Sequence, residues 1–268
     1  MSLAELFPDG DYRFHLTLRR AEPRDFFLPR DSSGRILAER TRWLASDPTT
    51  YATISPEGEE ALREFAALAS SWGVSFNGDP ATSSPTDLLH ELGRGLEPDI
   101  LFLSGDREDQ FRLRGGALCF PTGWALGDKL GGTMDVIHGV VPGLNAALAS
   151  PIHQFLSRLK PGMAFLRDNW GVTATDELNL HPSRGVAAPD LPVGLHQLWL
   201  RVEHQALMAL PRSRAIVFGI RIALHRMDEV SRGPHARLLR RALKTMPPEL
   251  VAYKRLKSIH GHLIDVLE

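Results

Sequence analysis

Hydrophobic positions in the first third of the chain recur every three or four residues, which predicts helices. The clearest helix begins at Ser55, a residue suited to the N-cap, and stops at Gly73; a shorter one follows Pro85, and another covers residues 36–44. The apolar faces of the two clearer helices comprise Leu62, Phe65, Ala66, Ala69, Leu88, Leu89 and Leu92. We expect these segments to form an N-terminal helical layer without catalytic residues.

Two other N-terminal segments have different patterns. Phe14, Leu16 and Leu18 alternate with polar residues, which predicts a strand. Residues 23–34 are charged and rich in proline, so we expect an ordered surface loop or entrance flap.

From Asp99 onward the pattern is typical of strands. Residues 100–105 and 110–120 are short apolar runs separated by a polar segment, which predicts a hairpin. Gly115 and Gly116 in the second run suggest a bulge or a close approach of the backbone to a neighbour. Neither a GxGxxG nor a GxxxxGK[ST] pattern is present, so the sequence does not favour a nucleotide-binding fold.

The middle of the chain continues with a helix, a strand and a long loop. Ser150 and Pro151 predict a helix start, and the helix ends before Pro161-Gly162. Residues 164–172 read as a strand, and residues 173–194 as a polar loop of the kind that covers a site. The helix's apolar face comprises Ile152, Phe155, Leu156 and Leu159.

A second pair of strands carries the charged residues of greatest interest. Leu198, Leu200 and Val202 share one face of the first strand, which places Arg201 and Glu203 on the other. In the second strand Ile216, Phe218 and Ile220 share a face, with Val217, Gly219 and Arg221 opposite. The pair is expected to present Arg201, Glu203 and Arg221 as one charged group, with space for a ligand at Gly219. A solvated outer face is the alternative.

Composition narrows the function classes. The chain has 268 residues, 43% of them hydrophobic, and a formal net charge of -1, which gives no electrostatic reason to expect nucleic acid or an anionic membrane as partner. Its single cysteine, Cys119, excludes an internal disulfide and a cysteine-rich zinc or iron–sulfur site in this chain. The N-terminus lacks a signal-peptide pattern, so we expect a cytoplasmic protein.

His138 is the candidate ligand residue. It ends the short apolar run that contains Met134 and Ile137, and Gly139 after it leaves room for a flat group to approach the ring. A packed core histidine is the alternative, and His153 is the rival ligand. Trp170 at the end of a predicted strand is suited either to a porphyrin face or to the core.

Five ordered blocks carry a resemblance to a known family. They are CFPTGW (119–124), KLGGTMDVIHGVVPGLN (129–145), LSRLKPGMAFLRDNW (156–170), LRVEHQALMALPRS (200–213) and FGIR (218–221). Together they resemble the haem-dependent oxidative N-demethylase family, formerly a domain of unknown function. The resemblance extends more loosely to LTLRR and ERTRWLASDP in the N-terminal third.

The resemblance implies a haem b subunit that oxidises dimethylamine with O2, giving a primary amine and formaldehyde. His138 would be the proximal iron ligand, with Trp170 and Gly219 beside the cofactor. Glu203 would hold the protonated amine, and Arg221 would donate hydrogen bonds near bound oxygen. Electrons would come from a flavin and iron–sulfur reductase that carries FMN and a [2Fe-2S] cluster and uses NADPH.

The expected fold is α+β: a PAS-like antiparallel sheet of about five strands with flanking helices, the PAS label coming from the resemblance. The expected domains are an N-terminal helical region (1–95), a haem-binding core (96–226) and a basic helical tail (227–268) that packs on the sheet or at an oligomer interface. One departure is Ile222-Ala223 after FGIR, where the family has a threonine–tyrosine pair. The alternative functions are a haem-based gas sensor and a cofactor-free partner-binding protein.

Overall fold

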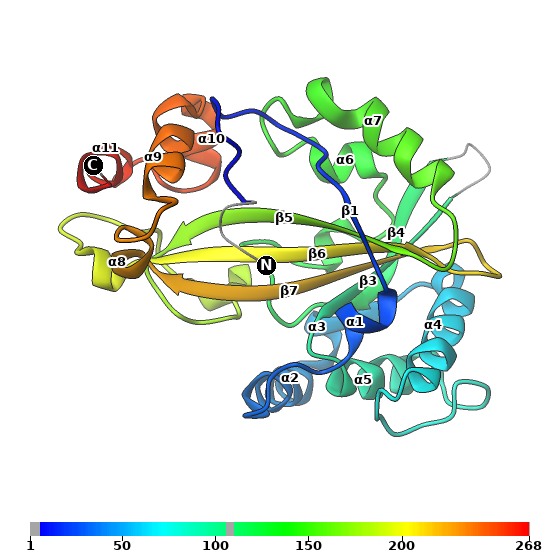
Figure 1. Ribbon diagram of the computed structural model, residues 1–268. Helices are drawn as coiled ribbons and strands as arrows, with labels where there is room; N and C mark the ends of the chain where they lie inside the picture. The colour runs from blue at the N-terminus through cyan, green and yellow to red at the C-terminus, as the bar shows by residue number, and fades with distance from the viewer. Residues whose placement is uncertain (1–5, 106–109, 268) are drawn as a thin grey trace.

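The computed structural model describes residues 6–105 and 110–267, which fold around one open antiparallel sheet (Figure 1). The sheet has seven strands in the order β1-β5-β6-β7-β3-β4-β2. Their bounds are β1 Arg19–Ala21, β2 Ala52–Ile54, β3 Asp99–Gly105, β4 Phe111–Ala117, β5 Ala164–Thr173, β6 Trp199–Ala209 and β7 Ile216–Arg226. The predicted α+β class is confirmed. The expected five strands were too few, because two three-residue edge strands, β1 and β2, extend the sheet.

Helices pack on the sheet in separate groups. In Figure 1, α1 to α5 lie below the sheet, α6 and α7 above its right part, and α9 to α11 above its left end. The bounds are α1 Pro23–Phe27, α2 Arg35–Ser46, α3 Pro48–Tyr51, α4 Glu59–Ser71, α5 Pro85–Gly95, α6 Met134–His138, α7 Leu144–Arg158, α8 Met227–Val230, α9 Ala236–Thr245, α10 Pro248–Tyr253 and α11 His260–Val266. In the described part of the chain, no helix is long and apolar enough to cross a membrane.

The N-terminal helical layer agrees with the predicted periodicity. The predicted faces of α4 and α5 are buried in one hydrophobic cluster with α2 and the sheet. The Ser84 hydroxyl caps α5 by accepting from the Asp87 N–H, 3.1 Å. The helix predicted from Ser55 starts with a 3₁₀ turn, Pro56–Gly58, before α4 begins.

Two N-terminal predictions were wrong. The segment expected to be a loop, residues 23–34, contains α1, because Phe26 and Phe27 are buried against the sheet and fix the chain there. The strand expected around Phe14 and Leu16 is absent among residues 11–18, and pairing starts only at Arg19. Phe14 and Leu16 still pack, partly buried, against the cluster that α7 forms with the sheet.

The hairpin of β3 and β4 is confirmed, although its turn at residues 106–109 lies outside the described residues. The predicted bulge is also present, because the register shifts between Phe102 and Leu103, which pair with Gly115 and Leu113. A Cβ on Gly115 would lie 2.3 Å from the Thr53 carbonyl oxygen, so the neighbouring strand β2 approaches too closely for any side chain.

α7 begins earlier than predicted. Ser150 and Pro151 look like a helix start, but the helix starts at Leu144, after Gly143 in the left-handed conformation (φ 75°). Pro151 lies inside the helix on its exposed side, and Leu148, Ile152 and Leu156 are buried on the other. The helix therefore packs along the sheet over 15 residues.

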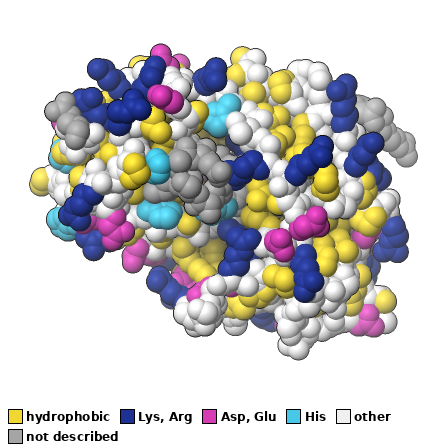
Figure 2. All heavy atoms as spheres, in the orientation of Figure 1, with side chains coloured by type: hydrophobic (Ala, Val, Ile, Leu, Met, Phe, Trp, Pro, Cys, Tyr) yellow, Lys and Arg dark blue, Asp and Glu magenta, His cyan; other side chains and the backbone are white. Residues whose placement is uncertain are grey.

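The C-terminal helices cover the ends of β5 and β6, as expected for an amphipathic tail. Leu239, Leu243 and Leu263 are buried in a cluster with Trp170 and Leu200. The outer face of α9 is basic and appears dark blue at the upper left of Figure 2. Its Arg241 forms ion pairs with Asp9 (3.4 Å) and Asp11 (3.1 Å), which fasten the N-terminal segment to the tail.

Candidate functional site

Glu203 lies in the middle of β6, half-buried, with both carboxylate oxygens hydrogen-bonded. Oε1 accepts from Thr122 Oγ1 at 2.6 Å, and Oε2 accepts from Gln205 Nε2 at 2.9 Å and from Asn169 Nδ2 at 3.3 Å. Asn169 and Thr122 are both exposed. The carboxylate is therefore held in place beside an open part of the sheet.

Arg201 lies two residues before Glu203 on the same face and is fully buried. Its guanidinium donates to the backbone oxygens of Phe120 (2.8 Å) and Leu178 (2.7 Å) and to Thr122 Oγ1 (3.0 Å). Burial lowers the pKa of Arg201 to about 10, although the nearby carboxylates favour the charged form. Thr122 thus accepts from Arg201 and donates to Glu203, which links the two residues that alternation placed together.

The predicted grouping of Arg221 with Arg201 and Glu203 is wrong. The register of β6 and β7 pairs Glu203 with Ile222 and His204 with Arg221, so Arg221 is on the opposite face. There it forms an ion pair with Glu97 and donates to the backbone oxygens of Phe26 (2.8 Å) and Leu28 (2.6 Å). Alternation fixes faces within one strand, whereas the register that relates two strands depends on the turn between them.

The space predicted beside Gly219 is filled by aromatic rings. A Cβ at Gly219 would lie 2.7 Å from Phe26 Cε1 and 2.9 Å from Phe27 Cε1. The glycine therefore admits the two phenylalanines of α1 rather than a ligand, which corrects its predicted position in a cofactor site.

His138 ends α6, whose first turn is capped by Thr133. The imidazole is half-buried and makes no hydrogen bond with any residue in the described part of the chain. Its pKa is lowered from 6.5 to about 4, first by burial and then by the positive charges of Arg167 and Lys129, with Asp135 opposing. At neutral pH the ring is uncharged and keeps a nitrogen lone pair available to a metal.

Arg167 and Lys129 relate His138 to Glu203. Each of these cations lowers the pKa of His138, and each interacts favourably with the Glu203 carboxylate. Arg167 is on the same face of β5 as Asn169, whose backbone pairs with Glu203. The site thus comprises a neutral histidine, a fixed carboxylate and two cations that interact with both. Sequence reasoning missed both cations, although alternation along β5 could have placed Arg167 on this face.

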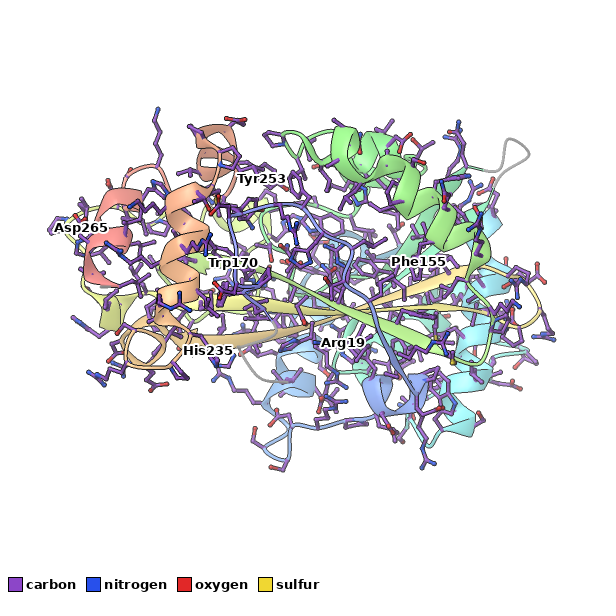
Figure 3. The ribbon with its side chains drawn as sticks, turned by 45° about the horizontal axis from the view of Figure 1, so that its top comes forward. Arg19, Phe155, Trp170, His235, Tyr253 and Asp265 are labelled. Atoms are coloured by element: carbon purple, nitrogen blue, oxygen red, sulfur yellow. The ribbon has the colours of Figure 1, made fainter. Side chains whose placement is uncertain are left out.

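Apolar side chains near His138 are left exposed. Val136 is 69% exposed and Val140 59%, and Leu130 follows Lys129 directly. Tyr253 on α10 is also exposed (Figure 3).

Trp170 is on the opposite face of β5 from Arg167 and Asn169, in the C-terminal hydrophobic cluster. Its ring packs edge-on against Phe7 at 5.2 Å, and Lys254 Nζ lies 5.1 Å from its centroid. Lys254 also donates to the Trp170 backbone oxygen at 2.5 Å and interacts with Glu203. The tryptophan therefore fills the core behind the site.

His153, the rival ligand in the sequence, is exposed on α7. Its ring lies 6.4 Å from that of Phe111 and 3.5 Å from Ser157 Oγ. The positive charges of Arg167 and Lys129 act on His138, where they lower the pKa of the imidazole.

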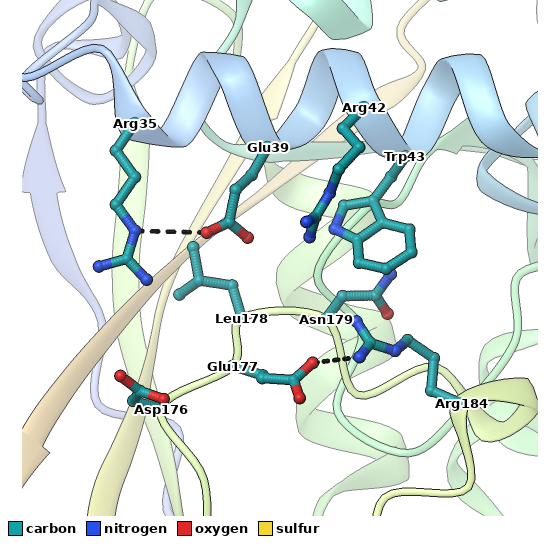
Figure 4. A pocket seen from close by; sticks show the side chains of 9 residues that line it. All are labelled: Arg35, Glu39, Arg42, Trp43, Asp176, Glu177, Leu178, Asn179 and Arg184. Carbon is teal, nitrogen blue, oxygen red and sulfur yellow. Dashed lines mark hydrogen bonds and ion pairs between the residues drawn. The ribbon is translucent and has the colours of Figure 1, made fainter.

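A separate polar cavity of about 310 Å³ lies between α2 and the loop after β5 (Figure 4). Four of its charged side chains are paired, Arg35 with Glu39 at 3.3 Å and Arg184 with Glu177. The Leu178 backbone that borders this cavity accepts a hydrogen bond from Arg201, so Arg201 joins the predicted covering loop to the Glu203 site.

A haem fits the residues around His138. The open ring nitrogen of His138 suits a metal, and the exposed apolar side chains suit a macrocycle. The two cations suit the acidic substituents of a haem. Among the described residues, no three His, Cys, Asp or Glu side chains gather as a metal site. Fold and site together define an α+β protein suited to a flat cofactor.

The family comparison agrees with this class. The model of the haem-dependent oxidative N-demethylase, alpha subunit-like family matches residues 70–264. The chain belongs to this family, as the five blocks predicted. The family description indicates haem dependence and an alpha subunit, hence a multi-subunit enzyme.

Proposed function

We propose that this chain is the haem-binding subunit of an enzyme that demethylates a small secondary amine such as dimethylamine, using O2. One observation carries the proposal: Arg167 and Lys129 each interact both with the neutral His138 ring and with the fixed Glu203 carboxylate. Family membership supports the reaction class. The products would be a primary amine and formaldehyde.

His138 would hold the haem b iron through its free ring nitrogen. Burial and the two nearby cations keep the imidazole uncharged at neutral pH, so no proton competes with the metal. The exposed Val136, Val140 and Leu130 would cover part of the macrocycle. When bound, haem supplies the oxygen-activating chemistry that oxidises the methyl group.

Glu203 would bind the protonated amine and orient it. Its two oxygens are fixed by Thr122, Gln205 and Asn169, and the buried Arg201 fixes Thr122 in turn. A dialkylammonium ion has two N–H donors that a carboxylate can accept in a charge-assisted hydrogen bond. A carboxylate held this firmly sets the direction in which the N-methyl group points.

A partner would supply the electrons. The one cysteine, Cys119, is buried, and burial raises its pKa to about 12, so it remains a thiol. This thiol cannot hold an iron–sulfur cluster, which requires several thiolates. We therefore assign FMN, a [2Fe-2S] cluster and the oxidation of NADPH to a reductase subunit.

Turnover by the haem-loaded chain with its reductase tests this function. We expect dimethylamine to yield methylamine and formaldehyde in equal amounts, and Glu203→Gln to lower kcat/KM by roughly 10- to 100-fold, because it removes a charged hydrogen-bond partner. Glu60→Gln, at an exposed position of α4, is the matched control and should keep full activity.

The haem spectrum of Glu203→Gln should equal that of the wild type, because Glu203 is assigned to the amine alone. Unchanged kcat/KM in Glu203→Gln would refute its role as the amine-binding group. Oxygen binding without formaldehyde formation in the wild type would instead favour the gas-sensor function.

A further inference from the structure

Arg167 differs from the other arginines buried in and under the sheet. Arg40 pairs with Asp99 at 2.5 Å, Arg221 pairs with Glu97, and Arg201 donates to three backbone oxygens and a hydroxyl. Within the described part of the chain, the Arg167 guanidinium has no hydrogen bond and no ion pair. A guanidinium carries five N–H donors, and leaving them without acceptors in a partly desolvated place is costly.

The two carboxylates that attract Arg167, those of Asp168 and Glu203, form their hydrogen bonds with other residues. Asp168 is on the opposite face of β5, where it accepts from Arg19 at 3.0 Å and His204 at 2.8 Å. Glu203 accepts three hydrogen bonds from Thr122, Gln205 and Asn169. Both attract Arg167 only at longer range. The positive charge of Arg167 thus remains available to an external anion.

Lys129 adds a second available cation on the same side. Its Nζ lies 4.5 Å from the centroid of the Trp124 ring, and no carboxylate of the described residues is within ion-pair distance. Lys129 and Arg167 both act on His138 and on Glu203, so the two charges lie in the same part of the molecule. A planar guanidinium with an ammonium beside it matches a carboxylate, because the guanidinium fork binds both oxygens and the ammonium adds a point charge.

We propose that Arg167, assisted by Lys129, forms a carboxylate-binding site beside His138. This site would serve the haem enzyme proposed above, so its function rests on that proposal. The bound carboxylate has two candidate sources. One is a propionate substituent of the haem; the other is the carboxylate of an N-methyl amino acid whose ammonium group Glu203 would hold. Both sources need the same chemistry at Arg167, and two binding experiments separate them.

The first experiment uses iron-free porphyrin and the full chain freed of haem. The wild type should bind protoporphyrin IX roughly 10- to 100-fold more tightly than its dimethyl ester, if a propionate is the ligand. Arg167→Gln should bind the acid as weakly as the ester, and Arg167→Lys should retain part of the difference. Quenching of tryptophan fluorescence measures each dissociation constant.

The second experiment titrates the haem-loaded chain with N-methylglycine and with dimethylamine, followed by the Soret band. If a substrate carboxylate is the ligand, the wild type should bind N-methylglycine at least 10-fold more tightly than dimethylamine. Arg167→Gln should lose that preference and retain its affinity for dimethylamine. The acid and the ester of protoporphyrin should then bind the wild type equally.

Arg158→Gln is the matched control, because Arg158 is exposed at the end of α7 and its loss changes the net charge equally. Circular dichroism shows whether each variant is folded, and Arg167→Lys keeps the test valid should Arg167→Gln not fold.

The proposal is overturned if a folded Arg167 variant binds all four ligands as the wild type does. Protoporphyrin lacks iron, so its binding tests the Arg167 site without testing His138 as an iron ligand. If protoporphyrin binding depends on Arg167 but the chain forms no histidine-ligated haem, the proposed function is refuted and the carboxylate-binding site is retained.

Discussion

Burial of His138 beside Arg167 and Lys129 makes the stability of the haem-free chain depend on pH. The pKa of His138 is about 4 in the folded chain against 6.5 for an ordinary histidine, so the unfolded chain binds more protons between these values. The contribution of the neutral His138 ring to the free energy of unfolding is complete above about pH 6.5 and is lost as the pH falls toward 4. From the size of the pKa shift, the loss is at most about 3 kcal/mol.

Urea unfolding of the haem-free chain between pH 7 and pH 4 checks this prediction. His138→Gln should reduce the loss of stability in that window, since glutamine does not titrate. His153→Gln, which removes an exposed histidine, is the matched control. Equal slopes for the wild type and His138→Gln would show that His138 titrates normally.

Single residues were predictable where their own strand decided their position. Alternation placed Arg201 and Glu203 on one face, and the end of a short apolar run singled out His138. Arg167 escaped notice because nothing in its local sequence shows that its guanidinium lacks a partner. That property depends on Asp168 and Glu203 being engaged by Arg19, His204, Thr122 and other residues distant in sequence.

At the scale of elements, the contact of α1 with β7 can be tested at Gly219. A methyl group there would lie within 3 Å of both Phe26 and Phe27, and the buried rings have little room to move. We expect Gly219→Ala to lower the free energy of unfolding by about 1 to 3 kcal/mol through overpacking. Urea denaturation measures the change.

Gly171→Ala is the matched control in β5, because a Cβ there meets no atom within 4 Å. It should alter stability by less than about 1 kcal/mol, in the range of strand propensities. Equal effects of the two substitutions would mean that α1 does not pack on β7 as described.

Helices with both a start signal and a regular apolar face were predicted well, as α4 and α5 show. α1 was missed because five residues are too few for periodicity, and Phe26 and Phe27 gain their stability from the sheet rather than from the helix. The start of α7 was misplaced because Pro151, a common first residue, occupies an exposed interior position.

At the scale of the whole molecule, the relation of β6 to β7 decides which charges share the site. The class of fold followed from the segregation of helices and strands, but the register followed from the hairpin turn and the packing of both faces. A shift of one residue would have moved Arg221 to the face of Glu203. The actual register instead gives Arg221 a structural role with Glu97, whereas the separate register of β5 with β6 puts Arg167 on the face of Glu203.

The absorption spectrum of the purified chain after haem reconstitution tests the central claim most directly. We predict a sharp ferric Soret band that changes on reduction with dithionite and shifts with dimethylamine. His138→Ala should lose or strongly alter this band, whereas His153→Ala should keep it. Failure of the wild type to bind one haem per chain, or an unchanged spectrum in His138→Ala, would contradict the assignment of His138 as the haem ligand.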